Sequence, residues 1–509
     1  PAPPRISILV PRIGGGGLKS GRRWGRTLGR VTEVGIRTAA ARPVSSASLA
    51  VFRITFGVAM VLNVALYVPE MVGSYYVEPN VLFPYPPFEW VAPPPGAGIY
   101  LVYAAMAATG VLIAVGRWYR PATLAFLALH TWVFLLDSTH YQNHEYLISL
   151  LALLLALLPA DRRWSLDARR RPARASDTVP AWTVWILRFQ IGVPYVFGGI
   201  AKLNGDWLRG EPLRMWLAAR TEVEPVATIL TTDWVVWAMA YGALVLDLTV
   251  VGFLSLRRTR VAAFAVVTCF HLMNVWLFGL FIFPWLMIAS TLIFFPPDWP
   301  ERLAAWWDAR MAPDPTPSVA GKASAAEAAA ARPSAAPSSA GATGVASGRV
   351  ESPDRAADLR PSAALVAFLA VWVAVQVALP LRHLLIPGDV NWTEEGHRFA
   401  WHMKLRDKSG TATFLVTLPD GRVVEVDPRD ELSAKQAGSL PGHPRRIVQY
   451  AHHLSDRYGG AEVRAETSVS LNGRAPQPIV DPTVDLAAVD PFWVGAADWI
   501  EPLVTPLDP

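Results

Sequence analysis

The stretch WTVWILRFQIGVPYVFGGIAKLNGDW (residues 182–207) decides how this chain is built. Residues 182–202 are mostly apolar and long enough to cross a membrane, and Lys202 stands at the end of this run. Because apolar surroundings disfavour an ammonium, a lysine in that position can act as a base. The alternative is a snorkelling lysine, whose stem follows the apolar end while its charge reaches water. Spacing alone leaves both interpretations open.

The composition indicates a membrane protein with several spans. Of 509 residues, 52% are hydrophobic and 17% charged, and the mean hydropathy is +0.29. The net charge of +5 comes from short basic clusters between apolar runs, which orient helices in a membrane better than they bind nucleic acid. We therefore expect no nucleic-acid partner. The single cysteine, Cys269, excludes an intrachain disulfide and a cysteine metal cluster.

Apolar runs predict about nine membrane spans. The sequence thus predicts an α-helical polytopic membrane protein with a C-terminal α+β extramembrane domain. Its parts are a basic segment (1–47), a catalytic membrane domain of eight spans (48–300), a linker (301–362), a ninth helix (363–380) and an outer domain (381–509). The predicted spans are 48–68, 98–116, 121–137, 145–160, 182–202, 234–256, 261–278, 280–296 and 363–380.

Basic residues fall at every second connection, which predicts the orientation. They lie at 22–42, at Arg117 and Arg120, at 161–174 and at 257–260. If these face the cytoplasm, the connections 70–97, 138–144 and 203–233 lie outside, together with everything after residue 380. We expect an integral membrane protein whose C-terminal domain lies on the outer face.

The last third of the chain changes in character. Residues 311–361, rich in Ala, Pro, Ser and Gly, are typical of a disordered cytoplasmic linker. Further on, alternating residues around Pro419-Asp420-Gly421 predict a hairpin of 411–417 with 422–426. Residues 447–458 have helical spacing, and 463–471 predict a strand that ends in an Asn472-Gly473 turn.

Several polar residues accompany Lys202. His144, with Asn143 beside it, begins the fourth span on the same predicted side of the membrane as Lys202. It is either a hydrogen-bonding residue or a catalytic one. His140 lies one turn earlier, but a zinc site lacks a third ligand, so no metal is expected. His271 and Asn274 lie within the seventh span, where polar groups serve either function or helix-to-helix hydrogen bonding.

Three further charges lie inside predicted spans: Arg53, Arg188 and Asp247. A structural ion pair is the favoured interpretation, with Asp247 neutralising one of the arginines. The chain has no Gly-rich phosphate loop, nucleophile elbow or HExxH motif, which weakens nucleotide-dependent and hydrolytic functions.

Taken in order, a set of short motifs between about residues 48 and 505 resembles the vitamin K-dependent γ-glutamyl carboxylase family, in its bacterial branch. Each motif is weak by itself, and the ordered set is specific. They are Phe52-Arg53, Asn143-His144-Glu145-Tyr146-Leu147, Asp161 to Asp167, Leu187-Arg188-Phe189-Gln190, Ala201-Lys202-Leu203 with Asp206-Trp207, Asp247 to Val250, Phe270 to Asn274, Ser470 to Arg474 and Asp481 to Asp485.

The resemblance implies a reaction and a set of site residues. A family lysine that matches Lys202 deprotonates vitamin K hydroquinone, here menaquinol or phylloquinol. Reaction with O₂ then supplies a base that removes the γ-proton of a peptidyl glutamate, CO₂ adds, and the quinone leaves as its epoxide. His144 matches the family histidine that assists carbanion formation or capture. The candidates for cofactor or substrate binding are Asn143, Arg53, Arg188, His271, Asn274 and Trp401.

The expected partners are a glutamate-containing secreted or membrane protein, membrane lipid and the quinol. The chain departs from animal members, which have a cysteine pair and a Tyr-rich run where this chain has Arg398-Phe399-Ala400-Trp401. Two other functions stay open at this point. One is a quinol epoxidase or oxidoreductase without protein carboxylation, and the other is a non-enzymatic membrane scaffold.

Overall fold

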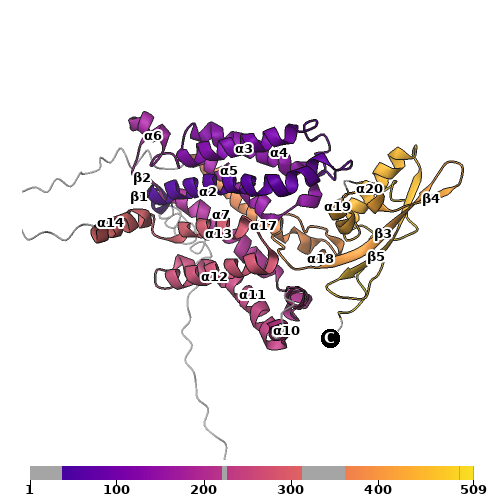
Figure 1. Ribbon diagram of the computed structural model, residues 1–509. Helices are drawn as coiled ribbons and strands as arrows, with labels where there is room; N and C mark the ends of the chain where they lie inside the picture. The colour runs from indigo at the N-terminus through magenta and orange to yellow at the C-terminus, as the bar shows by residue number, and fades with distance from the viewer. Residues whose placement is uncertain (1–36, 221–225, 312–361, 492, 494, 508–509) are drawn as a thin grey trace, which may run out of the picture.

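A bundle of long helices carries a smaller mixed domain at one end (Figure 1). This computed structural model describes residues 37–220, 226–311 and 362–507, except 492 and 494. Most of the basic segment 1–47 and most of the predicted linker lie outside the described residues. The first part of that linker belongs instead to a helix, α14, which runs from Trp299 to Met311.

Each of the nine predicted segments contains a helix. A π-helix, η1 (Val68–Val77), extends the first of them, and η4 (Leu292–Phe294) and η5 (Arg382–Leu385) extend two others. The helices are α2 (Ala47–Tyr67), α3 (Gly98–Val115), α4 (Tyr119–Leu136), α5 (Asn143–Leu157), α7 (Ala181–Ala201), α11 (Asp233–Ser255), α12 (Arg260–Phe278), α13 (Phe283–Thr291) and α17 (Ala363–Leu381).

The nine predicted segments differ in how well their length and composition suit a membrane span. Among the described residues, six helical segments are long and apolar enough to cross a membrane: α2 with η1, α3, α7, α11, α12 and α17 with η5. α5 has 15 residues and α13 has 9, which is too short for a typical bilayer. α4 has 18 residues, but polar ones such as Arg120 and His130 interrupt its apolar run. Apolar periodicity does not distinguish a short buried helix from a span.

Arg-rich connections gather at the end of the bundle that lies away from the mixed domain (Figure 1). A short antiparallel pair of β1 (Pro43–Ser45) with β2 (Thr178–Pro180) lies there, as do α6 (Leu166–Arg170) and η3 (Pro172–Arg174). Arg163 forms an ion pair with Glu301 of α14, and Arg117 Nη1 lies 3.2 Å from Asp167 Oδ1.

The other end of the bundle contacts the C-terminal domain through all three connections that were predicted to lie outside. Gln449 donates to Pro84 O at 2.9 Å, and Arg446 donates to Ser138 O at 3.0 Å. Arg474 binds Asp206 at 2.6 Å. The three connections and the C-terminal domain therefore share one end, and which end faces the cytoplasm stays a prediction. The short elements there are η2 (Ser138–His140), α8 (Gly205–Leu208), α9 (Leu213–Ala218) and α10 (Val226–Thr231).

The C-terminal domain has the predicted α+β composition. The hairpin is confirmed as β3 (Lys408–Thr417) with β4 (Val423–Val426), and β5 (Glu462–Leu471) completes an antiparallel sheet of order β4-β3-β5. The predicted helix is α20 (Pro444–Arg457), and β5 ends in a left-handed turn at Asn472 (φ 53°) and Gly473 (φ 82°). The remaining elements are α18 (Val390–Thr393), η6 (Pro428–Asp430) and α19 (Ala434–Ser439).

Candidate active site

A glycine near the end of α7, Gly199, helps to bring Lys202 to its position. A Cβ on Gly199 would lie 2.8 Å from the side chain of Leu248 and 3.0 Å from its backbone nitrogen, so α7 packs closely against α11 only because Gly199 has none. α7 ends at Ala201, with Lys202 as its C-cap. The chain then turns, because the Asn204 side chain caps α8 by accepting from Trp207 N at 3.0 Å.

Lys202 forms a buried ion pair with Asp247. Its Nζ lies 2.7 Å from Asp247 Oδ2 and 3.3 Å from Gly198 O. The two residues are 5% and 3% exposed, so the ammonium does not reach the surface as a snorkelling lysine would. A buried charge needs a partner, and Asp247 supplies it. The prediction that Asp247 neutralises an arginine was therefore wrong.

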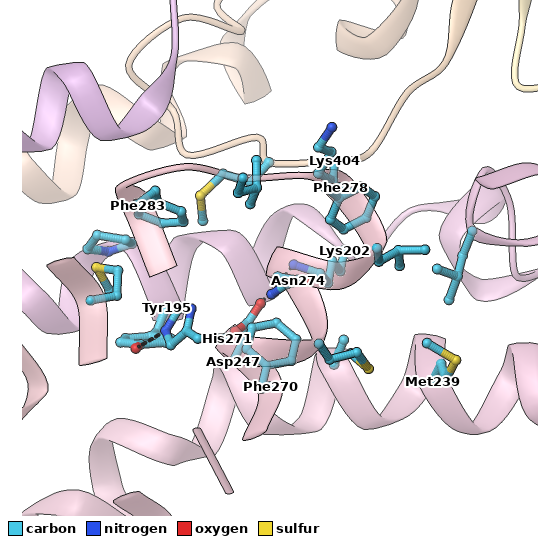
Figure 2. A pocket seen from close by; sticks show the side chains of 18 of the residues that line it. Tyr195, Lys202, Met239, Asp247, Phe270, His271, Asn274, Phe278, Phe283 and Lys404 are labelled. Carbon is cyan, nitrogen blue, oxygen red and sulfur yellow. Dashed lines mark hydrogen bonds and ion pairs between the residues drawn. The ribbon is translucent and has the colours of Figure 1, made fainter. Parts of the chain in front are cut away.

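The pair opens into a cavity of about 760 Å³, the Lys202 cavity, whose wall is mostly aromatic and aliphatic (Figure 2). Helices α7, α11, α12 and α13 and the segment around Met403 supply most of its lining, and α8 and α9 add one residue each. The lining residues are Pro194, Tyr195, Lys202, Trp207, Leu213, Met239, Ala243, Asp247, Phe270, His271, Met273, Asn274, Leu277, Phe278, Leu280, Phe283, Met287, Met403 and Lys404.

His271 and Asn274, both predicted site residues, line this cavity one helical turn apart on α12. His271 Nε2 lies 2.7 Å from Tyr195 OH, as the dashed line in Figure 2 shows. Its Nδ1 is buried and has no hydrogen-bond partner among the described residues. A buried ring nitrogen without a partner is available to a bound polar group.

A second cavity of about 1430 Å³, the His144 cavity, lies next to the first. Asn143 donates to His402 O at 3.3 Å and accepts from Tyr141 OH at 3.0 Å, which holds the start of α5 against the segment before β3. The lining of the His144 cavity is more polar than that of the Lys202 cavity. The lining residues are Asn63, Tyr67, Met71, Tyr141, Gln142, Asn143, His144, Phe278, Gly279, Leu280, Phe281, Ile282, Phe283, His397, His402, Met403, Lys404, Leu405 and Arg406.

A thin wall separates the two cavities. They share Phe278, Leu280, Phe283, Met403 and Lys404. The Phe283 ring stacks on His144 with centroids 5.5 Å apart and meets His271 edge-on at 6.1 Å. Phe283 therefore stands between a histidine of each cavity.

Cations and one carboxylate organise the polar side of the His144 cavity. Glu394 binds Arg406 Nη2 at 2.8 Å and Lys408 Nζ at 2.9 Å. Burial raises the pKa of Glu394, but Arg406 and Lys408 outweigh it and hold that pKa well below its usual value. Arg406 Nη1 is buried without a partner among the described residues, and burial lowers the pKa of Lys404. An anion in this cavity would meet two cations.

Two of the predicted binding residues lie far from both cavities. Arg53 donates to Ile113 O at 2.9 Å and to Trp164 O at 2.7 Å. Arg188 donates to Ile293 O and Phe295 O, each at 2.9 Å. Neither is among the residues that line the two cavities. Both guanidinium groups donate to backbone carbonyl groups, which explains how they are tolerated inside the bundle.

Two family models match the chain. Residues 41–299, about half of its length, match the HTTM domain. Residues 361–505 match the vitamin K-dependent gamma-carboxylase, lumenal domain. The chain belongs to the vitamin K-dependent gamma-carboxylase family. No solved structure matches it.

In this gamma-carboxylase-family chain, the lumenal-domain match covers the segment that closes the two cavities. Trp401, a predicted binding residue in that segment, is 1% exposed, packs against Tyr146 at 5.2 Å and lines neither cavity. The sequence analysis missed Met403 and Lys404, which line both cavities, and Arg406, which lines the His144 cavity. The signal was present in the sequence, because His402, Lys404 and Arg406 gather directly after Trp401.

Proposed function

We propose that this protein converts peptidyl glutamate to γ-carboxyglutamate, using CO₂, O₂ and reduced vitamin K, and releases the quinone as its epoxide. One observation carries the proposal. An ion-paired lysine in an apolar cavity and a histidine in a cation-lined cavity lie on opposite sides of one shared wall. Family membership supports the dependence on vitamin K in general.

The Lys202 cavity fits a quinol. Phe270, Phe278 and Phe283 offer flat apolar contacts, while the Lys202–Asp247 pair and His271 Nδ1 offer polar contacts to hydroxyl groups. When bound, reduced vitamin K would supply, on reaction with O₂, a base stronger than any side chain. Menaquinol is the quinol we expect in a bacterium, with phylloquinol as the second possibility.

The Lys202–Asp247 pair can take one proton from a bound hydroxyl group. As that O–H bond breaks, an O–H bond forms on Asp247 Oδ2, and the Lys202 ammonium remains beside the oxygen that lost its proton. The same result is reached when the proton of Lys202 first moves to Asp247 Oδ2 and the uncharged Nζ then takes the proton of the hydroxyl group. Either way, positive charge faces the new anion in a nearly dry site, where its stabilisation is strongest.

The His144 cavity suits the side chain of the peptidyl glutamate. Lys404 and Nη1 of Arg406, which has no partner in the described part of the chain, attract its carboxylate, and His144 stands beside the wall that faces the Lys202 cavity. Phe283 and Met403 line the passage between the cavities with apolar groups, which keeps bulk water from a strong base and a carbanion.

The substrate protein would approach from the end that carries the C-terminal domain. We place this end on the outer face of a bacterial cytoplasmic membrane, where a glutamate-containing secreted or membrane-anchored protein is accessible. The outer surfaces of α11 and α12 are apolar and exposed, for example at Trp237, Val245 and Val266, which suits contact with lipid and with an isoprenoid tail.

The test uses membranes that contain the full chain, supplied with reduced vitamin K, ¹⁴C-bicarbonate and a glutamate peptide. We expect ¹⁴C in the peptide and an equal amount of epoxide. Epoxide without ¹⁴C in any of several peptides would support a quinol epoxidase instead. An unconsumed quinol, with partner recruitment unaffected by Lys202→Ala, would support the scaffold alternative.

A further inference from the structure

A cavity of about 1320 Å³, the arginine cavity, lies beside the His144 cavity, where the bundle meets the C-terminal domain. One strip of chain, residues 394–399, separates the two cavities. Within this strip, His397 lines the His144 cavity, whereas Arg398 and Phe399 line the arginine cavity. The arginine cavity has no part in the proposed function so far.

Two contacts cross the strip and show how thin it is. Glu394 lines the arginine cavity and binds Nη2 of Arg406, which lines the His144 cavity, at 2.8 Å. The Phe399 ring meets the ring of Tyr141, another residue of the His144 cavity, edge-on with centroids 5.5 Å apart. A strip one chain thick measures about 10 Å with its side chains, and about three residues of an extended peptide span that distance.

Three arginines from three parts of the fold line the arginine cavity. Arg382 begins η5 after α17, Arg398 lies in the strip, and Arg445 lies in the first turn of α20. Arg382 and Arg445 each donate to two backbone carbonyl groups. The Arg398 side chain donates to none of the described residues, and its guanidinium carbon lies 5.1 Å from the centroid of the Tyr85 ring. The donors of Arg398 are therefore available to a ligand.

The carboxylates of the arginine cavity are engaged elsewhere. Glu394 binds Arg406 at 2.8 Å and Lys408 at 2.9 Å, neither of which lines this cavity. Glu395 Oε1 accepts from Trp493 Nε1 at 3.1 Å. Within the described part of the chain, no carboxylate forms an ion pair with any of the three arginines. The arginine cavity therefore has an excess of positive charge.

Two of the arginines also repel each other. Burial and the neighbouring Arg398 lower the pKa of Arg445 to about 10, although Glu395 and Asp490 act in the opposite direction. Guanidinium groups that share a partly buried space disfavour each other's charge. An anion between Arg398 and Arg445 would relieve this repulsion and accept hydrogen bonds from both.

A buried hydroxyl group in the arginine cavity lacks a partner as well. Tyr85 is 5% exposed, and its ring stacks on Phe134 with centroids 5.2 Å apart. Its OH forms no hydrogen bond with any described residue. A buried hydroxyl group is costly to leave unpaired, so Tyr85 has a donor to offer to a ligand. Because Arg398 lies over the Tyr85 ring, the two residues can serve one anionic group.

We propose that the arginine cavity binds an acidic side chain of the substrate peptide, about three residues from the glutamate that enters the His144 cavity. This inference rests on the proposed function, in which the target glutamate occupies the His144 cavity. The peptide would cross the strip and place one carboxylate on each side of it. The arginine cavity then selects glutamates that have an acidic neighbour.

The other candidate occupant is the headgroup of an anionic lipid. Arg382 ends a helix that is long enough to cross a membrane, and Leu385, three residues later, is 88% exposed. The peptide is favoured because Arg398 lies in the strip that also lines the His144 cavity, and Arg445 belongs to the C-terminal domain. Two of the three cations thus come from the parts of the chain that surround the proposed peptide site.

Peptides with one glutamate and either aspartate or asparagine three positions away test the proposal, because aspartate carries the charge but has no γ-methylene group. We expect KM to be about 10-fold lower for the aspartate peptide, with kcat unchanged, since this contact is remote from the reacting atoms. Arg398→Gln should raise KM for the aspartate peptide about 10-fold and leave the asparagine peptide unaffected. Arg429→Gln, which alters an exposed arginine paired with Asp427, is the matched control.

Charge reversal gives a stricter test. Arg398→Glu should bind a peptide with lysine three positions from the glutamate better than the aspartate peptide, which a merely structural role of Arg398 does not predict. Equal KM values for the aspartate and asparagine peptides with wild type would overturn the proposal. So would a difference between them that survives Arg398→Gln.

A second readout needs no quinol. Fluorescence anisotropy of the labelled peptides, with the full chain in phosphatidylcholine nanodiscs, should show tighter binding of the aspartate peptide, and this preference should disappear in Arg398→Gln. If the peptides bind equally, and added phosphatidylglycerol changes the activity of wild type but not of Arg398→Gln, the arginine cavity is a lipid site and the proposal is overturned. A wild type that prefers the aspartate peptide but forms no γ-carboxyglutamate supports the acidic-peptide site and overturns the proposed function.

Discussion

The Lys202 cavity and the His144 cavity share a wall but differ in almost every other respect. The first has a mostly aromatic and aliphatic lining, and apart from Lys404, which both cavities share, its charges are tied into the Lys202–Asp247 pair. The second is lined by histidines, amides and two cations, and it lies directly under the C-terminal domain. The difference indicates two reactants of different kinds, a lipid-soluble one on one side and an anionic one on the other.

The comparison also indicates how the reaction in one cavity is coupled to the reaction in the other. If reaction in the first cavity produces a base for use in the second, the wall has to bring the reacting atoms together while it excludes water. A change in the Lys202 cavity should then affect both products, whereas a change in the His144 cavity should affect only one. The predictions below use this asymmetry.

The largest effect is expected from Lys202→Ala. Removal of the group that handles the first proton should lower both epoxide and γ-carboxyglutamate by about 10²- to 10⁴-fold. An exogenous small amine that enters the vacated space should restore part of both. Product analysis with and without the amine checks this, and Lys435→Ala on the C-terminal domain is the control. Normal epoxide yield from Lys202→Ala would exclude Lys202 as the base.

His144→Gln should affect one product and spare the other. We expect γ-carboxyglutamate to fall by about 10- to 100-fold while epoxide formation continues, because the quinol is oxidised on the far side of the wall. The ratio of ¹⁴C incorporated to epoxide formed is the measurement. His452→Gln, which alters a histidine that bonds Val489 O, is the control. Equal loss of both products would show that the two cavities act as a single site.

Phe283→Ala should weaken the coupling between epoxide formation and carboxylation. With the ring removed from between His144 and His271, water reaches the space between the cavities, and the product ratio should fall on the order of 10-fold. Deuterium incorporation at the glutamate γ-carbon in D₂O should rise, since a quenched carbanion takes a solvent proton. Phe264→Ala, whose ring packs against Phe295, is the control for loss of an aromatic ring.

The helices could be predicted from the sequence because long apolar runs have few alternatives in a membrane. Their packing could not. Lys202 and Asp247 lie 45 positions apart, and their contact depends on which faces of α7 and α11 meet at Gly199. Asp247 was recognised as a buried charge needing a partner, but sequence alone could not say that the partner was a lysine rather than an arginine.

The candidate site, too, could be predicted from the sequence only in part. His144, Asn143, His271 and Asn274 were found because polar residues in apolar runs are conspicuous. Phe283 is one aromatic residue among many in such runs, and its position between two histidines appears only when α13 packs against α12. Lys404 and Arg406 precede β3 in a segment that looks like an ordinary polar connection until it closes the cavities.

The smallest effect concerns the junction that holds the C-terminal domain over the His144 cavity. Arg474 binds both oxygens of Asp206 at 2.6 Å, and Asn472 Nδ2 donates to Oδ2 at 2.8 Å. Burial raises the pKa of Asp206, but the hydrogen bonds from Arg474 and Asn472 outweigh it and bring that pKa below its usual value. Asp206→Asn should therefore lower stability by about 1 kcal/mol at pH 7, a modest figure because the pair is partly solvated.

The pH dependence of that difference tests its cause. A carboxylate whose pKa is lowered in the folded state adds stability above its unfolded value of about 3.9, and loses it as the pH falls through the folded value. Thermal unfolding of wild type and Asp206→Asn should thus differ at pH 7 and converge as the pH falls from about 5 to about 3. Asp420→Asn, in the exposed β3–β4 turn, is the control. A difference that persists unchanged at pH 3 would mean that the contact acts through packing rather than charge.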